Sequence, residues 1–114
     1  DIRLQVVHER VRDRTALLAA LDVEGLKPVG CDDSASSYSS ELALAIHVYL
    51  ARSTAALVVL QAEDLVGMAH PVNVPGTSDE HANWQRKVTA DISDAFGRAS
   101  SQRLFADVQR ARAP

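Results

Sequence analysis

The sequence predicts a mainly α-helical fold with one or two short β-strands. Apolar residues recur at helical spacing over residues 2–22 and 41–52, and a short apolar run occupies residues 55–60. Two further helical patterns end the chain, within residues 89–114. Helices therefore dominate, and only one segment is typical of a strand.

Residues 2–22 are expected to form an amphipathic helix. One apolar stripe runs along it at alternating three- and four-residue steps, broken only at Arg14: Leu4, Val7, Val11, Leu18 and Leu21. Gly25, followed by Pro28, is typical of a helix end. The stripe is too short to indicate a coiled coil, so we interpret the segment as a packed surface helix.

The second helix is expected over residues 41–52, after a turn-rich loop at 28–40. Ser39 or Ser40 is the expected cap, and Glu41 suits the first turn of a helix. Four apolar side chains are expected to share its buried face: Leu42, Ile46, Tyr49 and Leu50. His47 has no second ligand at the i+4 position, so we interpret it as a packed or surface histidine and not as a metal ligand.

Residues 55–60 are rich in β-branched side chains and are expected to form a buried strand. A helix followed by a buried strand is half of a parallel βα repeat, and the chain offers this strand no partner. Its sheet is therefore expected elsewhere in a longer protein. A short helix over residues 61–67 and a long irregular stretch over 68–83 follow.

The tail predicts two short helices. Ile92 and Phe96 form an i,i+4 pair after a cap at Thr89 or Asp91, and Ser100 is expected to cap a last helix over 101–112. We treat residues 1–114 as one segment with four parts: helices over 1–54, a strand over 55–60, a loop over 61–88 and tail helices over 89–114.

Composition excludes several classes of function. The chain has 114 residues and a net charge of −3, with no basic run, so neither a nucleic-acid partner nor a membrane surface is expected. No apolar run approaches the roughly 20 residues of a membrane span. The single cysteine, Cys31, fits a reducing compartment, and we expect a cytoplasmic protein without cofactor or metal site.

The most distinctive stretch is residues 72–88. Pro75-Gly76 predicts a tight turn, and Asn73 just before it can present an amide. The only tryptophan, Trp84, is flanked by Asn83 and lies close to an arginine; an indole with nearby hydrogen-bonding groups is what a sugar site requires. The alternative is structural: the two asparagines cap turns and Trp84 fills the core.

Four sequence blocks carry a family resemblance: VLQAEDLVG from Val59, VNVPGT from Val72, DEH from Asp79 and NWQRK from Asn83. They resemble the end of glycoside hydrolase family 77, the 4-α-glucanotransferases or amylomaltases. The signature of that family is similar to Q-L-E-D-L-x-G, then N-L-P-G-T, then D-E-H-P-N-W-R-R-K-L. The resemblance covers roughly residues 41–88.

The chain departs from the family signature at five positions. Ala62 and Val74 stand where Leu is usual, Ala82 stands for Pro, Gln85 stands for Arg and Val88 stands for Leu. No departure removes the residues to which the resemblance assigns substrate binding: Asn73, Pro75, Gly76, Asn83, Trp84 and Arg86.

The resemblance implies a (β/α)8 barrel whose last strand is 56–60, with the loop 61–84 at its catalytic face. It implies transfer of α-1,4-glucan segments between maltooligosaccharides by a retaining mechanism. The family's nucleophile, general acid/base and third acid lie upstream of this segment, so no residue here is assigned as catalytic and the chain alone is expected to be inactive. Glu63 and Asp64 are interpreted as helix-capping acids.

Two further expectations concern partners. The alternative to an enzyme segment is a self-standing helical interaction module, resting on the amphipathic helices at 2–22 and 41–52. For the chain by itself, the unpaired apolar run at 55–60 predicts one of two outcomes. Either the helices at 2–22, 41–52 and 101–112 cover the run, or it pairs with the same run of a second copy and forms a homodimer.

Overall fold

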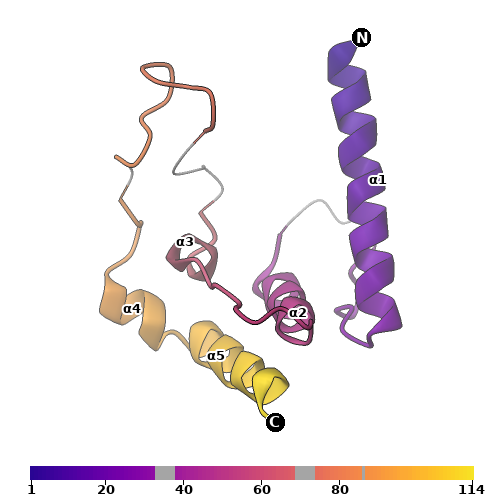
Figure 1. Cartoon of the computed structure of the whole chain (residues 1–114), viewed down its shortest axis with the longest axis vertical. Coiled ribbons are helices and arrows are strands. Elements are labelled where there is room, and N and C mark those ends of the chain that lie inside the picture. Colours follow the sequence, from indigo (N-terminus) through magenta and orange to yellow (C-terminus); the bar gives the residue numbers. More distant parts are fainter. Residues whose placement is uncertain (33–37, 69–73, 86) are drawn as a thin grey trace.

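The computed structural model describes residues 1–32, 38–68, 74–85 and 87–114. Within these ranges it is helical and contains no β-strand, which confirms the mainly α expectation (Figure 1). The helices are α1 (Ile2–Val23), α2 (Ser40–Ala51), α3 (Ala62–Leu65), α4 (Ile92–Gly97) and α5 (Ala99–Arg112). Residues 33–37 of the predicted 28–40 loop, and residues 69–73 and 86 of the predicted 61–88 loop, lie outside the described residues.

Helix α1 ends as predicted at Gly25. This glycine has a φ of 68°, and its amide donates to the carbonyl of Asp22 at 3.0 Å. The amide of Leu26 donates to the carbonyl of Leu21 at 2.8 Å. This pair of hydrogen bonds is a Schellman motif, which satisfies the last carbonyls of the helix and turns the chain toward α2.

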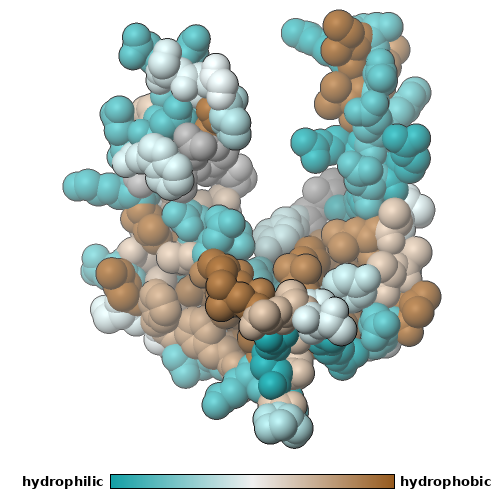
Figure 2. Space-filling view, in the orientation of Figure 1, coloured by the Kyte–Doolittle hydropathy of each residue, from teal (hydrophilic) through white to brown (hydrophobic). Residues whose placement is uncertain are grey.

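The core lies where the last turns of α1 meet α2. Leu18 and Leu21 are buried there against Leu42 and Ala45. The rest of the predicted apolar stripe is exposed: Leu4, Val7 and Val11. The expectation that the whole stripe packs is therefore wrong for this chain, because nothing described here reaches the first turns of α1, which stand clear with apolar side chains on the surface (Figures 1 and 2).

Helix α2 begins at its predicted cap, since the Ser39 hydroxyl accepts from the Leu42 amide at 3.1 Å. Its predicted buried face is only partly right, because Tyr49 and Leu50 are exposed. The helix packs between α1 and α5. Its buried side therefore includes small residues, which allow the neighbouring helices to approach closely. Besides Leu42, the buried residues of α2 are Ala43, Ala45, His47, Val48 and Ala51.

The predicted strand at 55–60 does not form. These residues have no regular secondary structure, and Leu57 is 78% exposed. A strand requires a partner for its ladder of hydrogen bonds, and the described residues supply none. The segment is instead held at its start by Arg112, whose guanidinium donates to the carbonyl of Ala56 at 3.1 Å and to that of Ser53 at 3.4 Å.

The tail contains the two predicted helices, but Ser100 is not the cap of α5. The helix starts at Ala99 after Arg98, without a side-chain cap. Two side chains of α5 bind carbonyls of α4 instead: the buried Ser101 hydroxyl donates to Ala95 at 2.6 Å, and Gln102 donates to Phe96 at 2.6 Å. The capping expectation failed because α4 ends directly before α5, so the polar groups there serve the carbonyls of α4.

Of the helices within the described ranges, none combines the length and the apolar character that a bilayer crossing demands.

Candidate functional site

The predicted substrate loop stands apart from the helical base, on the same side of the molecule as the free end of α1 (Figure 1). Of its six predicted binding residues, four are described: Pro75, Gly76, Asn83 and Trp84. Asn73 and Arg86 lie outside the described residues. The candidate site is therefore defined by the geometry of residues 74–85.

The Pro75-Gly76 turn forms as predicted. Gly76 has a φ of 80°, and the Thr77 amide donates to the carbonyl of Val74 at 3.3 Å. Proline at the second position and a positive φ at the third are the features of a type II turn. The Thr77 hydroxyl donates to the same carbonyl at 2.6 Å, which closes the turn a second time.

Asn83 ties the two ends of this loop together. Its Oδ1 accepts from the amide of Val74 at 2.9 Å, and its Nδ2 donates to Oγ1 of Thr77 at 3.0 Å. The side chain is half-buried and uses both its donor and its acceptor within the loop. The turn-capping part of the structural alternative is therefore right for Asn83.

Trp84 follows directly and projects from the loop. Its side chain is 75% exposed, so it fills no core among the residues that the structure describes. Its φ is 61°, an uncommon value for a bulky residue that costs on the order of 1–3 kcal/mol. Backbone hydrogen bonds on both sides hold it there, from the amide of Asn83 to the carbonyl of His81 and from the amide of Gln85 to that of Ala82.

A third contact organises the middle of the loop. The amide of Ser78 donates to a carboxylate oxygen of Glu80 at 2.7 Å. This hydrogen bond is the main reason that the pKa of Glu80 lies below its usual value. Because that pKa is lowered, the contact is fully present above the usual glutamate range and is lost as the pH falls through the lowered value.

We expect Asn83→Ala to loosen the loop without unfolding the helices, because it removes the acceptor and the donor that join Val74 to Thr77. Amide hydrogen exchange at Val74 should become at least about tenfold faster, as expected for losing about 1.4 kcal/mol of local protection. Asn83→Asp is the matched control, since it keeps the acceptor and should retain most of the protection at Val74. Equal exchange in all three proteins would contradict this role.

The segment before the loop contains the two acids of α3. The short helix ends at Gly67, which has a φ of 69°, and the carbonyl of Glu63 accepts from the amide of Met68 at 3.0 Å. Asp64 lies 3.5 Å from Nε2 of His47 on α2. This contact could not be predicted from the sequence, because the two residues are far apart along the chain and form no helical pair.

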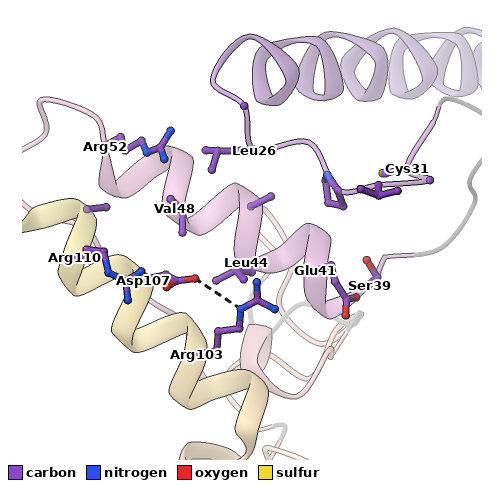
Figure 3. Close-up of a pocket in the computed structure, with 16 residues that line it drawn as sticks. Leu26, Cys31, Ser39, Glu41, Leu44, Val48, Arg52, Arg103, Asp107 and Arg110 are labelled. Carbon is purple, nitrogen blue, oxygen red and sulfur yellow. Dashed lines mark hydrogen bonds and ion pairs between the residues drawn. The ribbon is translucent and has the colours of Figure 1, made fainter.

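A separate cleft of about 870 Å³ lies between α2, α5 and the segment that follows α1 (Figure 3). Leu26, Leu44 and Val48 line its apolar part. Asp107 on α5 pairs with Arg110 at 2.7 Å and with Arg103 at 3.8 Å. In the part of the chain that the structure describes, no group of three or more His, Cys, Asp or Glu side chains is placed to hold a metal ion.

Comparison with known proteins identifies the family of the chain. The model of the 4-alpha-glucanotransferase family matches residues 4–93, which include most of α1, all of α2 and α3, and the whole 74–85 loop. The chain belongs to this family. The match contains both the helical core and the exposed tryptophan, so the expected resemblance is confirmed over more of the chain than its motifs cover.

Individual 4-alpha-glucanotransferases are similar to the chain. The enzyme of Haemophilus influenzae is 29% identical over 114 residues, which is 98% of this chain and 16% of that protein. The enzymes of Mycobacterium bovis and Mycobacterium tuberculosis are each 38% identical over 77 residues, 68% of this chain and 10% of theirs. The chain thus spans about a sixth or less of the length of these curated relatives.

Proposed function

We propose that the chain is the C-terminal part of a 4-alpha-glucanotransferase that transfers α-1,4-glucan segments between maltooligosaccharides. The observation that carries this proposal is the exposed Trp84, held at a positive φ on a loop whose ends are tied by Asn83. Family membership supplies the reaction class, and the loop supplies a group suited to a sugar.

The indole is the proposed contact for one glucosyl ring. A flat apolar face with an N–H at its edge suits the apolar face and the hydroxyls of a pyranose. The tied loop fixes that face before the sugar arrives, which lowers the ordering cost of binding. Pro75 and Gly76 shape the turn, and Asn73 and Arg86 are the proposed polar contacts beside it. Asn83 contributes mainly by holding the loop.

The proposed reaction retains the configuration at the anomeric carbon. It requires a carboxylate nucleophile and a carboxylic general acid/base on opposite sides of the scissile bond, about 5–5.5 Å apart. Glu63 and Asp64 are neighbours on α3 and cannot straddle a substrate in that way. We therefore place the catalytic acids in another part of the complete protein, and expect none in this chain.

The exposed apolar surface of the chain supports the proposal that it is part of a larger protein. In the proposed (β/α)8 barrel, α2 and residues 55–60 form the last helix–strand unit, and the exposed Leu57 and Val59 are covered by neighbouring strands. The exposed half of α1 packs against the same body. The single cysteine fits a reducing compartment, so the proposed location is the cytoplasm.

The test is disproportionation of maltotriose. The complete protein that carries this chain should form glucose and longer maltooligosaccharides, and the 114-residue chain should form neither. A folded complete protein without this activity would contradict the proposed function. Glucose release by the purified chain would contradict the placement of the catalytic acids. Sequencing upstream of Asp1 should in addition reveal βα repeats with those acids.

When expressed alone, the chain should dimerise through residues 55–60, because their apolar side chains and unpaired backbone are exposed. We expect light scattering to give a dimer mass, and Leu57→Lys together with Val59→Lys to return the monomer. Leu4→Lys is the matched control on another exposed apolar surface and should leave the dimer intact. A monomeric unsubstituted chain would contradict this expectation.

A further inference from the structure

His47 is a histidine of α2 that the proposed reaction does not use. It is 6% exposed, and its Nδ1 lies 2.6 Å from the carbonyl oxygen of Ala43. A carbonyl oxygen only accepts hydrogen bonds, so Nδ1 carries the proton of that bond. The other ring nitrogen, Nε2, is then an acceptor in the neutral imidazole and a donor only in the imidazolium.

Nε2 faces Asp64 of α3 at 3.5 Å. A proton on Nε2 lets the ring donate to this carboxylate, and an amide side chain in place of Asp64 could instead donate to Nε2. The carboxylate also lies near Tyr38, whose pKa is raised first by burial and second by the charge of Asp64. Arg98 lines the same small pocket as Asp64.

The other charged groups near α2 lie elsewhere. Arg103, Asp107 and Arg110 of α5 line the large cleft together with Val48 and Arg52 of α2. Glu63 shares α3 with Asp64. The contact of His47 with Asp64 thus joins α2 to α3.

Helix α3 depends on such contacts. It has four residues, Ala62–Leu65, and so short a helix is not stable without tertiary support. The chain runs from α3 directly to the substrate loop: six residue steps separate Met68 from Val74, a span of at most about 20 Å. The position of α3 on α2 therefore limits the positions that Val74, the first described residue of the loop, can take.

We propose that His47 is a positioning residue whose ring docks Asp64, and with it α3 and the base of the glucan-binding loop, on α2. The importance of this contact for transfer rests on the proposed function. The docking itself rests on the geometry of His47, Asp64 and Ala43.

The test compares substitutions of Asp64 in the 114-residue chain. Asp64→Ala removes the partner of His47, and we expect at least about tenfold faster exchange of the Met68 amide, which is bonded to Glu63 at the end of α3. Asp64→Asn should keep slow exchange, because its amide can donate to Nε2 of a neutral imidazole. Glu63→Ala is the matched control and should exchange as slowly as the unsubstituted chain.

Comparison of the two variants separates this role from simple packing, because a loss of packing alone would speed exchange equally in Asp64→Ala and in Asp64→Asn. Unchanged exchange in Asp64→Ala, or equally fast exchange in Asp64→Asn, would overturn the proposal.

Kinetic measurements on the complete protein test whether this contact affects glucan transfer. Asp64→Ala should raise the KM for maltotriose more than it lowers kcat, and Asp64→Asn should restore the KM. An unchanged KM in Asp64→Ala would overturn the effect on substrate binding. If the complete protein has no transferase activity, the proposed function fails, while hydrogen exchange in the two Asp64 variants still decides the docking.

Discussion

Leu21→Ala lowers the free energy of unfolding of the chain by about 3 kcal/mol. Leu21 is 0% exposed and lies among Leu18, Leu42 and Ala45, where α1 meets α2. Truncating a fully buried leucine removes its transfer free energy and leaves a cavity, which together cost about 2–5 kcal/mol. Small domains have only about 5–15 kcal/mol of stability, so this single change removes a large part of it.

Urea unfolding followed by far-ultraviolet circular dichroism measures this effect. Leu4→Ala is the matched control: it makes the same change on the same helix at an exposed position and should cost no more than about 0.5 kcal/mol. Leu21→Met roughly conserves volume and should cost less than about 1.5 kcal/mol. Similar losses for Leu4→Ala and Leu21→Ala would contradict the position assigned to the core.

The second large effect is expected at Trp84. In the complete protein, Trp84→Ala should reduce kcat/KM for maltooligosaccharides by about 10- to 100-fold, or about 1.4–2.8 kcal/mol of transition-state binding. The thermal midpoint of the 114-residue chain should hardly change, because the side chain is 75% exposed there. Activity should therefore fall without loss of fold.

Two further substitutions separate the indole from its backbone. Trp84→Gly removes the same ring but relieves the positive φ of 61°, so it should lose as much activity as Trp84→Ala while being at least as stable. Trp84→Phe retains an aromatic face and should keep intermediate activity. Wild-type kcat/KM in Trp84→Ala would show that the indole does not bind the glucan.

The helices could be predicted because local signals determine them. Gly25 and Ser39 mark helix ends through hydrogen bonds to backbone groups a few residues away, and both act as expected. The buried faces could not be predicted as reliably. Leu50 has the hydropathy of a core residue but is exposed, because contact with two other helices, and not the period of α2, decides which side is covered.

The strand at 55–60 illustrates a non-local requirement. Its composition is typical of a buried strand, but a ladder forms only with a partner, which the described residues lack. The four sequence blocks, of which Val59–Gly67 is the first, nevertheless identified the family correctly. Composition thus indicated an environment that is completed, in our proposal, only in the complete protein.

The site was predictable to a similar extent. The turn at Pro75-Gly76 follows from residue chemistry, and the exposed Trp84 agrees with a binding role. The bonds from Asn83 to Val74 and Thr77 could not be assigned, because the sequence does not show which backbone groups face a side chain. The contact between His47 and Asp64 was missed for the same reason.

The central claim is that this chain supplies the glucan-binding loop of a 4-alpha-glucanotransferase. The most direct measurement replaces the matching residues of the Haemophilus influenzae enzyme by this chain and follows disproportionation of maltotriose. We predict a folded chimera that forms glucose and longer maltooligosaccharides and loses most of this activity on Trp84→Ala. A folded chimera that is inactive, or one whose activity does not depend on Trp84, would contradict the claim.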